Sequence, residues 1–151
     1  GIPKIGNEES INSNLNLTVK YVDFKNNPVD IANISQGTDI KALVTISNPG
    51  TLNMDYKNLA LVFGAPTGWE IINQRMIDQN FSIEGVDYQD IRDDKIISYF
   101  ALSKNQTITI PLLFHAAFNG EFYLPAIDCE AMYDKTIHSR VKGQWVKIVK
   151  Q

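Results

Sequence analysis

The chain has 151 residues, of which 44% are apolar and 21% charged, and its acidic side chains exceed its basic ones by 17 to 14, which gives a formal net charge of −3. A chain of this length is expected to form one domain that buries roughly 68–70% of its unfolded surface. The acidic balance, without a basic run, argues against nucleic acid as a partner, and no apolar stretch is long enough for direct insertion into a membrane.

The beginning of the chain differs in composition from the rest. Residues 1–14 are polar, rich in Asn and Glu, and without apolar periodicity, which is typical of a linker or a mobile N-terminal segment. We therefore predict a single domain at residues 15–151. Because the chain starts at Gly1 rather than at methionine, we expect it to be a segment of a longer protein whose targeting information lies upstream.

Strands are predicted along the first half of the chain. Apolar residues at every second position predict strands at residues 15–22 and 40–46. Asn26-Asn27-Pro28 supplies a turn after the first strand, and Asn48-Pro49-Gly50 ends the second. Residues 59–63 form an almost continuous apolar run, as expected for a strand that is covered on both faces.

The alternation of apolar and polar residues then weakens before it returns. Residues 73–89 fit either a short helix or an irregular loop around Arg75 and Met76, and the two alternatives stay open. Residues 95–102 alternate again and predict a strand with Phe100 on its apolar face.

The strongest pattern lies between residues 106 and 134. Five apolar residues recur at every second position and predict a core strand: Ile108, Ile110, Leu112, Phe114 and Ala116. Asn119-Gly120 then predicts a hairpin, because both residues tolerate positive φ, and Phe122-Tyr123-Leu124 is expected to return antiparallel to that strand. Pro125 limits the return strand, since proline has no N–H to donate.

Met132 and Tyr133 place a thioether and a phenol side by side. Adjacent residues on an extended chain point to opposite sides, so one of the two is expected to be buried and the other exposed. Such side chains serve either as a plug in the domain's own core or as a contact for something else.

Residues 144–150 predict the last strand, and six or seven short strands without an amphipathic helix predict an all-β fold, an antiparallel sandwich.

The nucleophilic and metal-binding residue types are too scattered to indicate a site. His115 and His138 lie far apart, and Cys129, the only cysteine, has no Cys-x-x-Cys partner and excludes an internal disulfide. His115 falls on the face of its strand opposite the apolar residues, and a lone Cys in a strand is usually a small core residue. We therefore predict no cofactor and no metal.

An acidic cluster precedes the strand at residues 95–102, and its members are Asp87, Asp90, Asp93 and Asp94. Its spacing does not match an EF-hand loop, which needs a glycine at the sixth position and a glutamate at the twelfth. The simpler interpretation is a structured turn, with Arg92 paired to a carboxylate.

Motifs spread along nearly the whole chain together resemble a known family. In chain order they are Gly1-Ile2-Pro3, Gln36-Gly37-Thr38, Pro66-Thr67-Gly68-Trp69-Glu70, Asp90-Ile91-Arg92-Asp93-Asp94-Lys95, the pattern Gly120-x-Phe122-x-Leu124-Pro125, and Glu130-Ala131-Met132-Tyr133-Asp134. They are similar to P-x-G-W/F-E, D-x-R-D-D-R/K, G-x-F-x-x-P, E-A-M-Y-x-P and neighbouring positions of the last domain of bacterial alpha-2-macroglobulins. The chain departs from that family at His115, Cys129 and Lys135.

The resemblance implies an immunoglobulin-like, macroglobulin-like β-sandwich that forms the C-terminal domain, MG10, of its parent and is comparable in place to the receptor-binding domain of the animal proteins. Members are large proteins of the cell envelope that face the periplasm, often as lipoproteins, and that trap proteases without being enzymes. The implied partners are the thioester domain and the other macroglobulin-like domains of the parent chain, and target proteases that the parent engages.

The resemblance also implies roles for particular residues. In thioester-bearing relatives the Met-Tyr pair packs over the thioester and keeps water from it, and this role falls to Met132 and Tyr133. If the parent lacks a thioester, the pair is expected to serve as a domain contact or as core. The remaining motif residues are expected to be structural: Arg92, Asp93, Asp94, Gly120, Pro125, Glu130 and Asp134.

Two other classes of function compete with this interpretation. One is a stand-alone adhesin or ligand-binding sandwich that binds a protein or a glycan without any parent chain. The other is an enzyme that uses a metal at the acidic cluster around Asp90. The resemblance favours the non-enzymatic domain of a protease-trapping protein.

Overall fold

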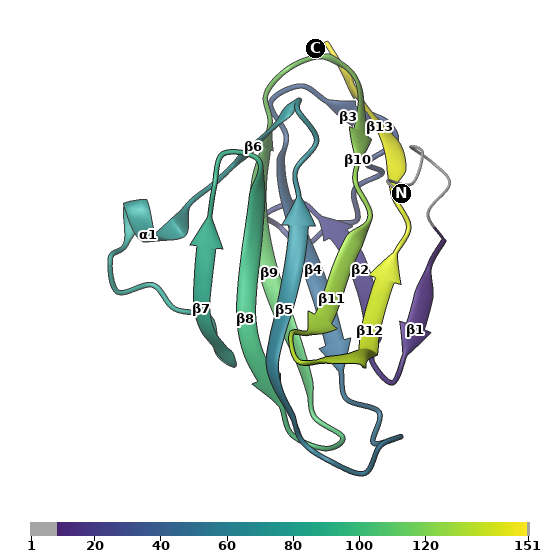
Figure 1. Cartoon of the computed structure of the whole chain (residues 1–151). Helices are drawn as coiled ribbons and strands as arrows, with labels where there is room; N and C mark the ends of the chain where they lie inside the picture. The colour runs from purple at the N-terminus through teal and green to yellow at the C-terminus, as the bar shows by residue number, and fades with distance from the viewer. Residues whose placement is uncertain (1–8, 151) are drawn as a thin grey trace.

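Strands account for most of residues 9–150, the part of the chain that the computed structural model describes (Figure 1). The elements are β1 (Ile11–Ser13), β2 (Asn16–Val22), β3 (Ile34–Ser35), β4 (Asp39–Ser47), β5 (Tyr56–Gly64), β6 (Trp69–Ile71), α1 (Gln74–Ile77), β7 (Val86–Ile91), β8 (Lys95–Leu102), β9 (Thr107–Ala116), β10 (Gly120–Leu124), β11 (Ile127–Ala131), β12 (Asp134–Val141) and β13 (Gln144–Val149).

Two antiparallel sheets form the layers of a sandwich. The six-stranded sheet has the order β1-β12-β11-β5-β8-β7, and the four-stranded sheet behind it in Figure 1 has the order β2-β4-β9-β6. A three-stranded sheet, β10-β13-β3, lies at one end, and its β13–β3 pair is parallel. The prediction of an all-β antiparallel sandwich is confirmed.

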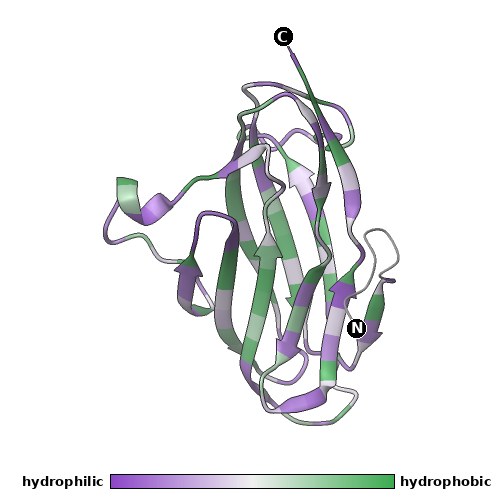
Figure 2. Ribbon diagram, turned by 45° about the horizontal axis from the view of Figure 1, so that its top comes forward, coloured by the Kyte–Doolittle hydropathy of each residue, from purple (hydrophilic) through white to green (hydrophobic). Residues whose placement is uncertain are grey.

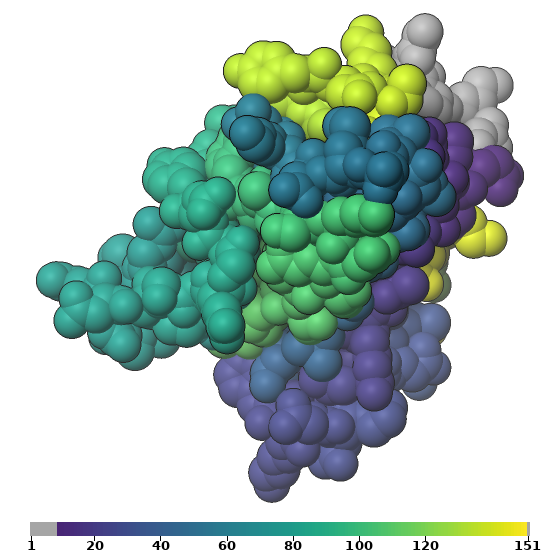
Figure 3. Space-filling view, turned by 90° about the horizontal axis from the view of Figure 1, so that it is seen from below, coloured from purple at the N-terminus to yellow at the C-terminus, as the bar shows by residue number. Residues whose placement is uncertain are grey.

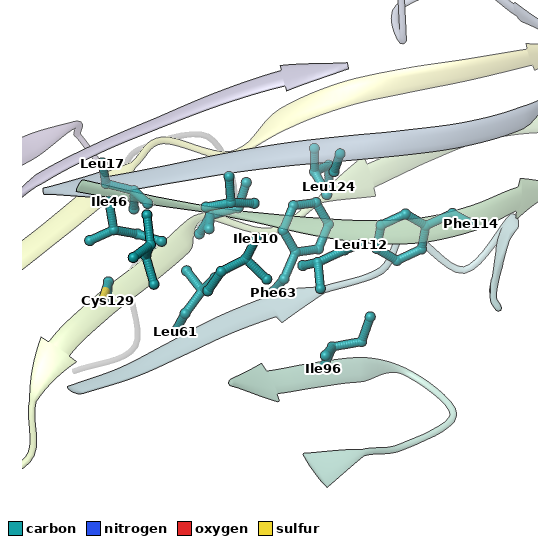
Figure 4. Packing of buried hydrophobic residues seen from close by; sticks show 14 of the residues in the cluster. Leu17, Ile46, Leu61, Phe63, Ile96, Ile110, Leu112, Phe114, Leu124 and Cys129 are labelled. Atoms are coloured by element: carbon teal, nitrogen blue, oxygen red, sulfur yellow. The ribbon is translucent and has the colours of Figure 1, made fainter. Parts of the chain in front are cut away.

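The core lies between the two layers, and β9 supplies much of it. The residues of β9 that alternate toward the six-stranded sheet are all buried, which confirms the predicted core face. Phe114 stacks on Phe63 of β5 with ring centroids 5.1 Å apart and meets Trp69 of β6 at 5.4 Å. Figure 4 shows Leu112 and Phe114 meeting Phe63 across the layers, and Figure 2 shows the apolar residues along the central strands.

The predicted hairpin at Asn119-Gly120 is wrong. Both edges of β9 are already paired, one with β4 and the other with β6, so no ladder remains there for a returning strand. Instead the chain passes Gly120 with φ of 139° and β10 pairs with β13 in the third sheet. The predicted end of that strand is confirmed, since β10 stops at Leu124, immediately before Pro125.

Besides the short strands β1, β3 and β6, three longer strands were not predicted. Within residues 73–89 the short helix exists as α1, but β7 begins at Val86, and none of the β7 residues is fully buried, so no alternation marks it. The other two are β11 and β12, in residues that the sequence left without an assignment. In β12 only Ile137 and Ser139 are buried, which is too weak a pattern to recognise.

The predicted N-terminal linker at residues 1–14 is described only in part. Residues 1–8 lie outside the described residues. Ile11–Ser13 form β1, which pairs with β12 at the edge of the six-stranded sheet, and Ser139 donates a hydrogen bond to the Ile11 carbonyl (3.1 Å). The folded part therefore starts ahead of residue 15.

Candidate functional site

Met132 and Tyr133 form the turn between β11 and β12, and we call this pair the hairpin tip. Both side chains are exposed, Met132 by 46% and Tyr133 by 84%. The expectation that one of them is buried is wrong, because the pair sits in a turn and not on an extended strand. Their exposure excludes the first of the two alternatives, a plug in the domain's own core.

The hairpin tip is fixed to the neighbouring strand through its backbone. The Met132 N–H donates to the carbonyl oxygen of Asn58 at 3.0 Å. Asn58 has φ of 56° and lies in an irregularity of β5 between Tyr56 and Leu59, where the pairing with β8 shifts register. Asparagine tolerates this left-handed conformation better than most residues. The bulge thus aims a carbonyl at the hairpin tip.

Asp134, which follows the hairpin tip, closes the turn. Its carboxylate accepts hydrogen bonds from the backbone N–H of Thr136 (3.0 Å) and from its hydroxyl (2.6 Å). The hydroxyl first, and then the backbone N–H, hold the pKa of Asp134 below its ordinary value. The Thr136 carbonyl in turn accepts from Ser13 (2.7 Å) and Asn14 (3.0 Å), so the turn is tied to the start of the domain.

Replacing Thr136 by valine should raise the pKa of Asp134 toward its usual value of about 3.9, because the hydroxyl donor is lost. A carboxyl with a lowered folded pKa stabilises the fold above its unfolded pKa, and the contribution disappears as the pH falls through the folded pKa. The variant should therefore lose stability at neutral pH, and the loss should shrink below about pH 4. NMR titration of the Asp134 carboxyl carbon measures the pKa. Thr136→Ser keeps the hydroxyl and should keep the low pKa; equal midpoints for valine and wild type would contradict the assignment.

A groove lies beside the hairpin tip. Tyr133 and Met54 form its walls, and Met54 comes from the loop between β4 and β5. Figure 3, seen from below, shows this loop in dark blue next to the hairpin in yellow-green. The sequence did not single out Asn58 or Met54, because their proximity to the hairpin tip comes from the pairing of β5 with β11, far apart in the chain.

The acidic motif lies at the opposite end of β5 from the hairpin tip, near Gly64. The Arg92 guanidinium binds one oxygen of Asp90 through two nitrogens, at 3.0 and 3.1 Å, which confirms the predicted pairing to a carboxylate. Asp93 and Asp94 lie in the turn between β7 and β8, and the carbonyl of Asp94 accepts from the N–H of Ala65 at 2.8 Å. Asp87 and Asp90 lie on β7, so the predicted structured turn is formed by Arg92, Asp93 and Asp94 alone.

The remaining motif residues with an expected structural role are Gly120, Pro125 and Glu130. Gly120 lies against the Phe122 ring, since a Cβ placed there would be 3.1 Å from its Cζ atom. Pro125 packs on Gly64, where a Cβ would lie 3.2 Å from the proline Cγ. Glu130 is exposed on β11, opposite His138.

The histidines and the cysteine do not converge. His115 is on the outer face of β9, as predicted, and its Nδ1 lies 2.7 Å from Asp39. His138 is 3.3 Å from Asp128, which also accepts from Arg140 at 2.7 Å.

Cys129 is fully buried, as predicted for a small core residue, and burial raises the pKa of its thiol. Within residues 9–150 no group of three or more His, Cys, Asp or Glu is arranged to hold a metal ion. No helix in that same range is long and apolar enough to cross a membrane.

Comparisons with known proteins place the chain in one family. The model of the bacterial alpha-2-macroglobulin MG10 domain matches residues 15–135. The alpha-2-macroglobulin of Rickettsia conorii is 28% identical over 132 residues, which is 83% of this chain and 7% of that protein. That of Pasteurella multocida is 23% identical over 148 residues, which is 95% of this chain and 7% of that protein. The chain therefore spans less than a tenth of the length of these relatives.

Solved structures share the fold. Native Escherichia coli alpha-2-macroglobulin, from domain MG7 to the C-terminus, matches with a TM-score of 0.83 and 16% identity over 98% of this chain and 25% of that chain. Salmonella alpha-2-macroglobulin reacted with methylamine matches with a TM-score of 0.80 and 16% identity over 94% of this chain and 10% of that chain. At such identities the likeness shows the fold, whereas the match over residues 15–135 shows the family: this chain belongs to the bacterial alpha-2-macroglobulin MG10 domains.

Proposed function

We propose that this chain is the C-terminal domain of a protease-trapping alpha-2-macroglobulin, in which Met132 and Tyr133 pack over a thioester in a neighbouring domain and keep water from it. The observation that carries the proposal is the exposure of both side chains, 46% and 84%, at a turn whose backbone is tied to Asn58. Large apolar side chains held outward at a fixed turn are suited to covering a partner's surface.

The chemistry of a thioester explains why these side chains suit the task. Its acyl carbon is attacked by water, so it survives only in a dry enclosure. Methionine adapts its shape to an irregular surface, and tyrosine adds a broad ring that loses little conformational freedom on burial. Neither side chain offers a base that would activate water. The hairpin tip therefore excludes solvent without promoting hydrolysis.

Because the curated relatives are far longer than this chain, we infer that other domains of the parent carry the thioester and the region that proteases cleave. The E. coli relative is known in forms activated by trypsin and by porcine elastase, and we propose that proteases act on this parent in the same way. The proposal includes a cell-envelope location that faces the periplasm, with the parent as a lipoprotein. Recovery of the parent in the cytoplasmic fraction of broken cells would contradict that location.

The presence of a thioester is tested by the intact mass of the full-length parent before and after methylamine. The amine attacks the acyl carbon, an amide forms, and the cysteine sulfur leaves as a thiol. We expect the mass to rise by one methylamine and the number of thiols, counted after denaturation, to rise by one. An unchanged mass in a freshly prepared parent would remove the shielding role and leave the hairpin tip as an interdomain contact.

Shielding itself is tested by Tyr133→Ala in the same parent. We expect spontaneous loss of the thioester to accelerate about tenfold, equivalent to roughly 1.4 kcal/mol of lost contact. The isolated domain should keep its stability within about 0.5 kcal/mol, because the side chain is largely exposed. Tyr88→Ala, an exposed tyrosine on β7, is the control and should leave the hydrolysis rate unchanged. A wild-type hydrolysis rate in the Tyr133 variant would refute shielding.

A further inference from the structure

The groove beside the hairpin tip has room for a side chain. Its volume is about 220 Å³. Buried apolar residues of β5, β11 and β12 line it, namely Tyr56, Ala131 and Ile137, and the exposed side chains of Met54 and Tyr133 stand beside them. A pocket for a small organic ligand usually encloses about 300–1,000 Å³. This groove is smaller and suits one large side chain.

The polar groups of the groove are mostly engaged within the domain. The Tyr56 hydroxyl donates to the Asn14 carbonyl at 2.7 Å. Asp55 accepts from the N–H of Lys104 at 2.8 Å, and Asp134 accepts from Thr136. These groups therefore have their partners already, and what the groove offers inside is apolar surface.

Lys57 is the one cation among the described residues that line the groove. It lines the groove and is exposed, and no residue in the described range 9–150 forms an ion pair or a hydrogen bond with its ammonium. Lysine stems cover apolar surface while the charge stays at the edge, where a carboxylate of another domain can reach it. Asp55 and Asp134 also line the groove, and neither carboxylate forms an ion pair within residues 9–150. The groove thus combines an apolar interior with an ammonium group whose nitrogen has no partner in that range and with two carboxylates that are already hydrogen-bonded.

We propose that this groove takes one apolar side chain of the thioester-bearing domain of the parent, and that a carboxylate next to that side chain pairs with Lys57. The inference rests on the proposed function and enlarges the contact from the hairpin tip to Met54 and Lys57. Two observations select this occupant. Tyr133 belongs both to the hairpin tip and to the groove, so whatever covers the tip covers the groove, and the curated relatives extend far beyond this domain.

The experiment measures thioester lifetime in the full-length parent with three substitutions side by side. Met54→Ala removes a wall, Lys57→Glu reverses the charge, and Tyr133→Ala reports on shielding. Leu52→Ala is the matched control, because Leu52 is an exposed apolar residue of the same loop but does not line the groove. The fraction of parent that still incorporates methylamine is followed over time. We expect Met54→Ala and Lys57→Glu to shorten the lifetime about threefold each and Leu52→Ala to leave it unchanged.

The outcomes separate the two proposals. If Tyr133→Ala shortens the lifetime and Met54→Ala and Lys57→Glu do not, the groove is not part of the contact and the shielding role stands. If none of the three has an effect, both proposals are overturned. A second readout locates the partner: a carbodiimide should join Lys57 to a carboxylate of the thioester domain, as identified by peptide mass spectrometry. A product between Lys57 and any other domain would overturn the assignment of the occupant.

Discussion

Replacing Phe114 by alanine should lower the free energy of unfolding of the isolated domain by about 3–5 kcal/mol. The ring is fully buried between the layers, where it stacks on Phe63 at 5.1 Å and meets Trp69 at 5.4 Å. Its removal loses the transfer free energy of the ring and leaves a cavity that β9, paired on both sides, cannot close. Urea unfolding followed by tryptophan fluorescence gives the free energy.

Phe118 provides the comparison. It follows β9 closely in the chain but is 56% exposed, so Phe118→Ala should change the stability by no more than about 0.5 kcal/mol. Similar losses for the two variants would mean that the inward face of β9 does not form the core as described.

Gly68→Ala should destabilise the domain by about 1–3 kcal/mol, because the added methyl overlaps the Phe122 ring. A Cβ at Gly68 would lie 2.6 Å from the Phe122 Cδ2 atom, and a Cβ at Gly120 would lie 3.1 Å from Cζ of the same ring. Both glycines belong to the motifs that resemble the family, and their common contact with one ring explains why these positions are small.

A double-mutant cycle with Phe122→Ala tests this explanation. Without the ring, Gly68→Ala should have an effect of less than about 0.5 kcal/mol, so the two substitutions should be strongly non-additive. Thermal or urea unfolding of the four proteins provides the values. Additive losses would show that the methyl at position 68 collides with something other than Phe122.

The strands that could be predicted are those with one face in the core. β4, β8 and β9 alternate between buried and half-buried or exposed residues along most of their length, which the sequence displays directly. β7 and β12 lack that signal, because β7 is an edge strand and β12 buries only two residues. The prediction of a hairpin at Asn119-Gly120 was wrong because a local turn signal does not show which strand edges are free to pair.

Of the candidate site, only Met132 and Tyr133 could be predicted from the sequence. The motif resemblance pointed to Met132 and Tyr133. Both are exposed because they lie in a turn, whereas the sequence pattern suggested an extended chain with only one of them exposed. The anchoring by Asn58 and the adjacent groove arise from pairing between β5 and β11 and leave no mark in either segment alone. The family assignment agrees with the predicted absence of enzymatic activity and disfavours a stand-alone adhesin.

The bond between the Met132 N–H and the Asn58 carbonyl has a consequence for how the proposed cover is lifted. A flexible loop can swing aside by itself, whereas this turn is joined to a central strand and cannot retract without disrupting the six-stranded sheet. Exposure of a thioester beneath it would therefore require displacement of the entire domain as a rigid body. Under the proposed function, cleavage elsewhere in the parent would act by releasing this domain as one docked module.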